Sequence, residues 1–237
     1  MIAVRALLFD TLGTLVDWRG GLIVHLETWG AARGISADWE GLVDTWRGAY
    51  VPSMARVRAG ERDWADLDDL QRESVKALAP RFGVSGLHGD ALEELVHMWH
   101  ELPPWPDSVE GLGRLKKKYI ISTLTNGNVA LMTNLGKFGG LPWDVILASD
   151  LVKHYKPDRE MYLSAPFYLD LKPEEVMMCA AHVGDLKAAR SYGLRTGFIH
   201  RPNEFGDGPV GVPDKAQPGD FDVVSESVID LAQQMDA

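Results

Sequence analysis

The chain has little cysteine, a deficit of positive charge and no long apolar segment. Its single cysteine, Cys179, excludes an internal disulfide framework and predicts a cytoplasmic protein. The 24 lysines and arginines are outnumbered by 34 aspartates and glutamates, and the formal charge of −10 argues against nucleic acid and anionic membrane as partners. No run approaches the roughly 18 apolar residues of a membrane span. The N-terminus has no charged-then-apolar leader, so we expect no secretion signal.

The chain is nevertheless large and apolar enough for a substantial core. It has 237 residues, of which 46% are hydrophobic, and shows no internal repeat. This size allows one large domain, or a domain that carries a smaller one. An anionic substrate would require cations gathered locally, because the chain as a whole is acidic.

The first predicted strand ends in a carboxylate. Residues 6–9 read Ala-Leu-Leu-Phe, a short apolar run typical of a strand buried on both faces of a parallel sheet. Asp10 follows at once, and a buried, unpaired carboxylate costs several kcal/mol. Ligands of open α/β sheets bind at the carboxyl ends of the strands. Asp10 is therefore either a partnered structural acid or a working group.

The rest of the chain divides into two regions with different hydrophobic patterns. Residues 18–102 show helical spacing, with four predicted helices and no convincing strand. From residue 103 helices alternate with strands, predicted at residues 119–124, 144–148, 176–181, 196–200 and 221–224. We therefore predict an α/β fold with a doubly wound, mainly parallel, Rossmann-like sheet core. Residues 1–17 and 103–237 would form this core, and residues 18–102 a helical cap inserted after the first strand.

Three further polar segments follow predicted strands and should converge on Asp10. They are residues 125–128 (Thr-Asn-Gly-Asn), 155–158 (Tyr-Lys-Pro-Asp) and 180–185 (Ala-Ala-His-Val-Gly-Asp). Each alone has a structural explanation, namely a turn with a helix N-cap, a solvated lysine and a helix start. Their joint occurrence at strand ends favours a functional site.

This set of motifs resembles the haloacid dehalogenase superfamily over nearly the whole chain, cap position included. The resemblance implies a nucleophilic Asp10, a hydroxyl at Thr125, Lys156 and the acidic Asp185. Phosphatases of the superfamily carry a second Asp two residues after the first, where this chain has Leu12, so a leaving alkoxide would lack its acid. The magnesium-dependent members also have a second acid in the last motif, where this chain reads Ala189-Arg190. We therefore expect neither metal nor cofactor.

A halide leaves carbon without needing a proton, and the L-2-haloacid dehalogenases of the superfamily show this pattern. Trp46-Arg47 matches the position of their cap arginine, and the segments at 125–127 and 155–158 resemble their Ser-Asn-Gly and Tyr-Lys-Pro-Asp elements. The resemblance implies attack by Asp10 on C2 of a small 2-haloalkanoic acid, an aspartyl ester, and hydrolysis to the 2-hydroxy acid with Asp185 and Lys156 at the water. Arg47 and Asn126 would receive the halide. The substrate-binding candidates, halide site included, are Thr11, Leu12, Thr14, Arg47, Thr125 and Asn126.

His182 departs from the better-known haloacid dehalogenases, which have Asn there. A similar Ala-Ala-His element occurs in a subgroup with defluorinating members, which makes fluoroacetate a candidate substrate. His182 is open to three interpretations: a base for the hydrolytic water, a donor to the halide, or a brace for its turn.

Alternatives from other classes stay open. One is a magnesium-dependent phosphohydrolase of the same superfamily, and another is a catalytically silent fold used for binding. A homodimer is implied by the family alone. The loop at residues 201–219, rich in glycine and proline, receives no role from the sequence.

Overall fold

The first strand lies inside a parallel sheet, between two other strands, which explains its unbroken apolar sequence. The computed structural model describes residues 3–207 and 211–237. Its sheet has the order β2-β1-β3-β4-β5, with every pair parallel. All four residues of β1 are buried. The strands are β1 (Ala6–Phe9), β2 (Ile120–Thr123), β3 (Val176–Ala180), β4 (Arg195–Ile199) and β5 (Val223–Ser225).

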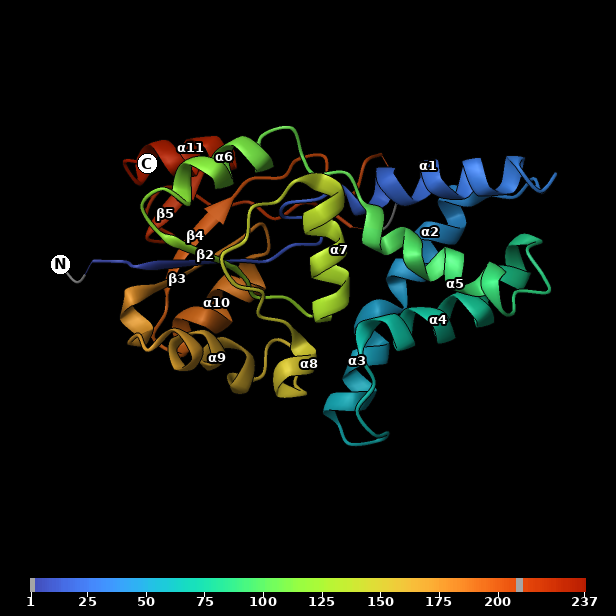
Figure 1. Cartoon of the computed structure of the whole chain (residues 1–237), viewed down its shortest axis with the longest axis horizontal. Coiled ribbons are helices and arrows are strands. Elements are labelled where there is room, and N and C mark those ends of the chain that lie inside the picture. The colour runs from blue at the N-terminus through green and yellow to red at the C-terminus, as the bar shows by residue number, and fades with distance from the viewer. Residues whose placement is uncertain (1–2, 208–210) are drawn as a thin grey trace.

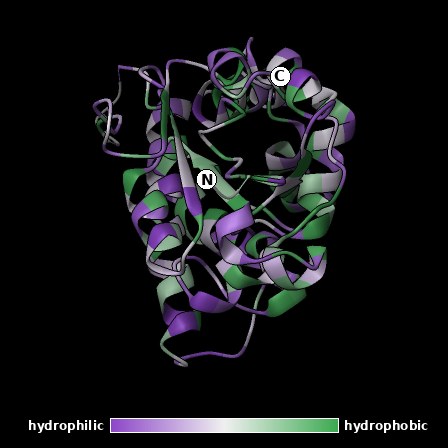
Figure 2. Ribbon diagram, turned by 90° about the vertical axis from the view of Figure 1, so that its left-hand side faces the viewer, coloured by the Kyte–Doolittle hydropathy of each residue, from purple (hydrophilic) through white to green (hydrophobic). Residues whose placement is uncertain are grey.

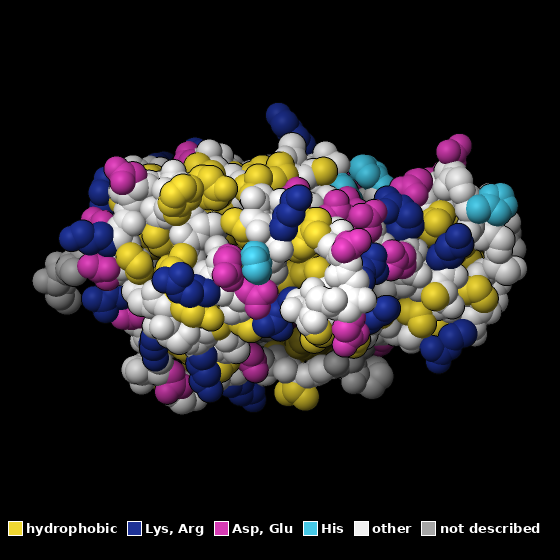
Figure 3. Space-filling view, turned by 90° about the horizontal axis from the view of Figure 1, so that it is seen from below, with side chains coloured by type: hydrophobic (Ala, Val, Ile, Leu, Met, Phe, Trp, Pro, Cys, Tyr) yellow, Lys and Arg dark blue, Asp and Glu magenta, His cyan; other side chains and the backbone are white. Residues whose placement is uncertain are grey.

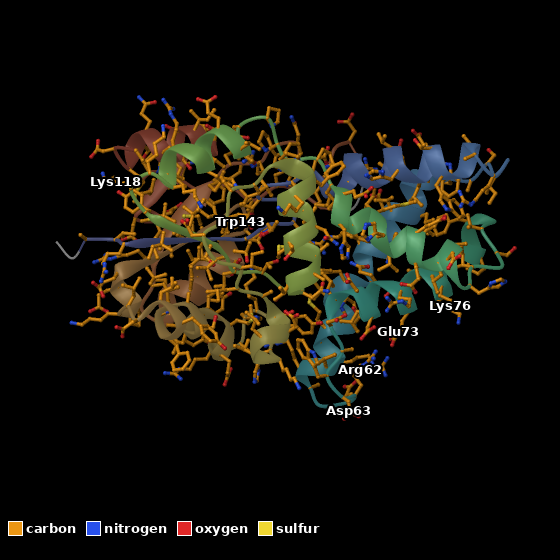
Figure 4. The ribbon with its side chains drawn as sticks, in the orientation of Figure 1. Arg62, Asp63, Glu73, Lys76, Lys118 and Trp143 are labelled. Atoms are coloured by element: carbon orange, nitrogen blue, oxygen red, sulfur yellow. The ribbon has the colours of Figure 1, made fainter. Side chains whose placement is uncertain are left out.

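Helices cover both faces of this sheet (Figures 1 and 2). Leu7 and Phe9 of β1 belong to the hydrophobic cluster under α6, α7 and α11, whereas Ala6 and Leu8 pack with α9 and α10 on the other face. This alternation follows from the two-residue period of a strand. Trp143 lies between Phe9 and α7, while Lys118 lies at the far end of the core from the cap (Figure 4). The core helices are α6 (Ser108–Leu115), α7 (Val129–Gly139), α8 (Ser149–Val152), α9 (Arg159–Leu169), α10 (Val183–Ser191) and α11 (Val228–Gln234).

The segment after β1 is helical, as the spacing predicts, and lies at the carboxyl ends of the strands (Figure 1). Its tryptophans are mainly core, and Trp46 meets Trp99 edge to face at 5.4 Å. The sequence predicts four helices here, but the structure has five α-helices, because the second predicted helix breaks at Ala49. They are α1 (Trp18–Ala31), α2 (Trp39–Gly48), α3 (Tyr50–Arg58), α4 (Leu67–Leu78) and α5 (Asp90–His97), with 3-10 turns at 79–82 and 98–101.

The two chain segments that connect core and cap run side by side. The backbone N–H of Asp17 donates to the carbonyl of Pro103 at 2.9 Å, and the N–H of Trp105 donates to the carbonyl of Leu15 at 2.9 Å. These bonds satisfy backbone groups that would otherwise be left open between two units. We propose that the cap, residues 18–102, begins and ends at this pair of segments.

One predicted strand is wrong. Residues 144–148 make only two isolated parallel bridges to the β2 segment, at Val145 and Ala148. Side chains take the places of ladder partners here. The Asp144 carboxylate accepts from the N–H of Ile121 at 3.0 Å, and the Thr123 hydroxyl both donates to the carbonyl and accepts from the N–H of Leu147. The segment therefore follows the sheet edge without joining it as a regular strand.

The surface mixes both signs of charge. On the face shown in Figure 3, basic and acidic side chains are interspersed with hydrophobic ones. At the lower edge of the cap, Arg62 and Glu73 pair at 2.6 Å (Figure 4). Among the described residues, none of the helices is both long and apolar enough to cross a membrane.

Candidate active site

The predicted motifs converge on a cavity between the sheet and the cap. This cavity of about 310 Å³ lies where β1 and β3 end, and α2 and α3 contribute to its wall. It is lined by Asp10, Leu12, Arg47, Tyr50, Asn126, Lys156, Pro157, Tyr162, His182, Gly184 and Asp185. A larger cavity of about 570 Å³ lies in the cap, among acidic and histidine side chains. It contains no strand-end group, so the smaller cavity is the candidate active site.

Asp10 is a buried carboxylate with a full set of donors. The Thr14 hydroxyl donates to Oδ2 at 2.9 Å, Lys156 Nζ donates to Oδ1 at 2.8 Å, and His182 Nδ1 lies 3.0 Å from Oδ2. Burial alone would raise the pKa of Asp10, but the charge of Lys156 and the hydrogen bond of His182 hold that pKa well below its usual range. Asp10 is therefore ionised at neutral pH.

Lys156 joins two carboxylates. Its Nζ donates to Asp185 Oδ2 at 2.5 Å as well as to Asp10, and the other oxygen of Asp185 accepts from the Tyr162 hydroxyl at 2.6 Å. Burial would lower the pKa of Lys156, but the two carboxylates raise it above its ordinary value. The backbone N–H of Lys156 donates to Asn126 Oδ1 at 2.6 Å, which brings two of the predicted motifs into contact.

The donor set does not fit a divalent cation. Lys156 Nζ takes the position between Asp10 and Asp185 where a shared cation would bind. Ca²⁺ takes six to eight oxygen ligands and Mg²⁺ about six, several of them waters. Within residues 3–207 and 211–237, no group of three or more His, Cys, Asp or Glu side chains is placed to hold a metal ion. The position between the two carboxylates is thus suited to an ammonium group and not to a divalent cation.

His182 stands between two carboxylates. Its Nδ1 faces Asp10 and its Nε2 lies 2.9 Å from Oε1 of Glu204, a residue of the loop after β4. Burial would lower the pKa of His182, but hydrogen bonds to Asp10 and Glu204 raise it to about 10. In the resting site the ring is therefore an imidazolium that donates to both acids.

Arg47 approaches from the cap, and aromatic rings hold it. Its Cζ lies 4.3 Å from the centroid of the Tyr50 ring and 5.3 Å from that of Trp18. Rings that face a guanidinium leave its edge free to donate. Its Nε is buried and has no hydrogen-bond partner among the described residues. Arg47 is thus suited to receive an anion inside the cavity.

Seven of the ten predicted site residues line this cavity, and three do not. Those that line it are Asp10, Leu12, Arg47, Asn126, Lys156, His182 and Asp185. The other three are buried beneath it. The Thr14 hydroxyl is engaged by Asp10 and by the N–H of Ala181, and Thr125 Oγ1 accepts from the N–H of Gly127. Thr11 Oγ1 has no partner in the described part of the chain.

Three functional candidates were not predicted from the sequence. Tyr50 follows Arg47 by three residues, and this spacing is a signal that could have indicated a stacked pair. Tyr162, which binds Asp185, lies in α9 among other buried apolar residues and had no such signal. Glu204 lies in the loop at residues 201–219, where no periodicity exists to indicate burial.

The fold and the site together are those of an α/β hydrolytic core with a helical cap over its carboxylate. A Rossmann-like core holds an ionised aspartate at the end of β1, an interior strand of its sheet, facing a cavity roofed by an inserted helical cap. A family model described as haloacid dehalogenase-like hydrolase matches residues 4–193. The chain belongs to this family.

Individual relatives agree with the family match. The (S)-2-haloacid dehalogenase 1 of Pseudomonas sp. (strain CBS-3) is 31% identical over 208 residues, 86% of this chain and 88% of the relative. A crystal structure of an L-2-haloacid dehalogenase is 46% identical, with a TM-score of 0.94 and 99% of both chains covered. That of a defluorinating L-2-haloacid dehalogenase is 44% identical, with a TM-score of 0.92, covering 99% of this chain and 96% of that chain.

Proposed function

We propose that this protein is an (S)-2-haloacid dehalogenase that hydrolyses short 2-haloalkanoic acids to 2-hydroxy acids without a metal. The observation that carries the proposal is the placing of an ionised Asp10 opposite Arg47 in one small cavity. Leu12 stands where a leaving-group acid would be, which suits a leaving group that needs no proton. Chloroacetate and L-2-chloropropionate are the expected substrates, and fluoroacetate is a further candidate.

The first step is displacement of halide by Asp10. A carboxylate oxygen attacks C2 from the side opposite the carbon–halogen bond, which inverts C2 and forms an aspartyl ester. Arg47 donates to the halogen as its negative charge grows, an interaction stronger in the transition state than in the ground state. Asn126 is the second candidate for the halide. Its Oδ1 accepts from the backbone N–H of Lys156, and its amide NH₂ group is the part that can donate to the halide.

The substrate carboxylate needs donors of its own. The backbone N–H groups of Thr11 and Leu12 have no acceptor among the described residues, and both lie in the turn directly after Asp10. These groups, with the turn at Thr125, form the proposed carboxylate site. Thr14 is better assigned to holding Asp10, because its hydroxyl is already used there.

The second step is hydrolysis of the ester. Water attacks the carbonyl carbon of the esterified Asp10 and the bond from that carbon to the ester oxygen breaks, so the ester oxygen leaves in the 2-hydroxy acid and the water oxygen completes the Asp10 carboxylate. Asp185 is held by Lys156 and Tyr162 at the same edge of the sheet and orients this water. The two acids therefore divide the chemistry, with Asp10 as nucleophile and Asp185 as positioning group.

Halide release with EDTA present throughout tests the proposal. We expect turnover of chloroacetate and L-2-chloropropionate that is lost in Asp10→Asn, by about 10⁴-fold or more. Asp63→Asn, an exposed change in the cap, is the matched control and should keep full activity. Fluoride release from fluoroacetate tests the third substrate. No halide from any of the three would overturn the proposal, and phosphate esters with Mg²⁺ would become the next assay.

A further inference from the structure

Glu204 is a buried acid that has no part in the two steps of the proposed reaction. It is 1% exposed, although it lies in a loop otherwise rich in exposed residues. Its Oε1 lies 2.9 Å from His182 Nε2 and accepts from Trp18 Nε1 at 3.4 Å. Among the described residues no lysine or arginine forms a salt bridge with it, so its cationic partner is His182. Such burial of a carboxylate is costly unless that pairing is retained.

The fold holds Glu204 directly against the turn that carries Asp10. Gly13 in that turn has φ +88°, and a Cβ there would lie 2.2 Å from Glu204 Oε1. Arg201 ties the start of the loop to the same turn, because its Nε donates to the carbonyl of Thr14 at 2.7 Å. The Arg201 guanidinium also donates to both carboxylate oxygens of Asp107. The close packing against Gly13 and the hydrogen bonds of Arg201 therefore hold the Glu204 carboxylate beside Nε2 of His182.

We propose that Glu204 is a positioning residue that keeps a proton on Nε2 of His182, so that Nδ1 exchanges protons at Asp10. This inference rests on the proposed function. A neutral imidazole carries one proton, and an acceptor at Nε2 selects the tautomer with a lone pair on Nδ1. That lone pair is directed at the Asp10 carboxyl group, 3.0 Å away. A buried acid that orients a histidine in this way is a general device of nucleophilic enzymes.

The proton steps balance over one turnover. Once the carbon–halogen bond has broken and the Asp10 ester has formed, the imidazolium gives its Nδ1 proton to solvent. Nδ1 then takes a proton from the water that attacks the ester carbonyl, and the departing alkoxide takes that proton. The new carboxylic acid of Asp10 protonates Nδ1, which restores the resting ion pair. One water is consumed, and one halide and one proton are released.

Ester formation itself prepares His182 to act as a base. In the resting site, Asp10 and Glu204 both raise the pKa of His182. The ester carries no charge, so His182 then loses one of its two anionic partners and its pKa falls, while Glu204 remains in place to hold the tautomer. A single residue thereby donates to Asp10 before alkylation and accepts from water after it.

Glu204→Gln separates the two chemical steps. It keeps the size of the side chain but removes its charge. With L-2-chloropropionate we expect a burst of about one chloride per active site, followed by steady turnover about 100-fold slower than wild type. The Asp10 peptide should accumulate the ester, seen as added mass in rapidly acid-quenched samples. Turnover at the wild-type rate with no ester accumulation would overturn the proposal.

Two further variants distinguish positioning from a structural effect. Glu226→Gln breaks a similar pair on the surface, where Glu226 Oε2 lies 3.1 Å from His200 Nδ1, and should leave turnover unchanged. In a His182→Asn background, Glu204→Gln should add no further loss, because the two residues act as one unit. An equal additional loss in that background would show that Glu204 acts otherwise.

The outcome for the wild-type enzyme keeps the two proposals apart. If wild type releases no halide, the proposed function fails. If wild type releases halide but Glu204→Gln behaves like it, only the role of Glu204 fails.

Discussion

The core forms the floor of the active site and the cap forms its roof, and the two sides differ in how their charged groups are paired. On the floor, supplied by the core, Asp10 and Asp185 share Lys156, and His182 joins Asp10 to Glu204. The roof, supplied by the cap, offers Arg47, held by ring faces and without an acidic partner among the described residues. Each carboxylate of the floor has a cationic partner before a substrate arrives, whereas Arg47 in the roof keeps donors without an acceptor among the described residues.

This difference assigns a separate task to each side. Because the charged side chains of the floor are already paired, the floor is preorganised, and its donors and acceptors need no rearrangement when charge moves during the reaction. Counting both sides, Lys156, His182 and Arg47 balance the three carboxylates, although the whole chain carries −10. An anionic substrate is therefore drawn by unused donors of the roof and the Asp10 turn, rather than by net charge.

The largest effect on stability is expected for Lys156→Met, which removes the cation that two carboxylates of the floor share. Removing the shared ammonium leaves Asp10 and Asp185 buried without their common cation, so we expect a loss of about 3–5 kcal/mol in the free energy of unfolding. The matched variant Arg47→Met removes a cation with no acidic partner and should change stability by less than about 1 kcal/mol. Urea denaturation of both measures the difference. Equal losses would contradict the distinction between floor and roof.

Arg47→Lys tests the roof through catalysis rather than stability. Lysine keeps the charge but loses the planar fork and the stacking on Tyr50, so charge developing on the halide is less well stabilised. We expect kcat for chloropropionate to fall about 100-fold or more, with the melting temperature nearly unchanged. Arg58→Lys, at the outer edge of the cap, is the control and should retain most activity. A rise in KM alone would show that Arg47 binds ground state and transition state equally.

The His182 pair makes stability depend on alkaline pH. The folded pKa of His182, about 10, lies above its ordinary value of 6.5, so its stabilisation is complete below about pH 6.5 and lost as pH rises through 10. We expect the free energy of unfolding to fall by up to a few kcal/mol between pH 7 and 10, and by less in His182→Asn. His200→Asn is the control and should follow wild type. A parallel decline in all three proteins would contradict the pairing.

The smallest effect is expected where cap and core meet at the surface. Arg58 of α3 donates to Asp158 at 2.6 Å, just beyond Lys156 in the chain. Both side chains are partly exposed, so Arg58→Ala should lower stability by less than about 1 kcal/mol and change kcat/KM by less than about threefold. Thermal unfolding and steady-state kinetics measure both. A large loss of activity would mean that this ion pair controls the position of the cap.

Much of the site was predictable because it depends on local pattern. The apolar run of β1 ends at Asp10, and β3, parallel to β1, brings Asp185 to the same edge of the sheet. Lys156 reaches this edge after the segment at 144–148, which follows the sheet without being a regular strand. The segment at 144–148 was mistaken for a regular strand because its apolar pattern does not reveal that Thr123 and Asp144 occupy the ladder's hydrogen-bonding groups. Thr14 is predicted to bind substrate from its residue type alone, and the contacts of its hydroxyl with Asp10 and Ala181 are visible only in the structure.

The sequence by itself determined the fold class, the cap insertion after β1 and the chemistry available at the strand ends, because periodicity and motif order are local properties of the chain. Only the tertiary structure decided the partners. Glu204 meets His182 and Gly13 through a loop without periodicity, and Arg47 meets Trp18 only after the cap has packed. Hydrogen bonds and ring contacts between distant segments depend on side-chain positions to within an ångström or so, and local pattern does not specify these.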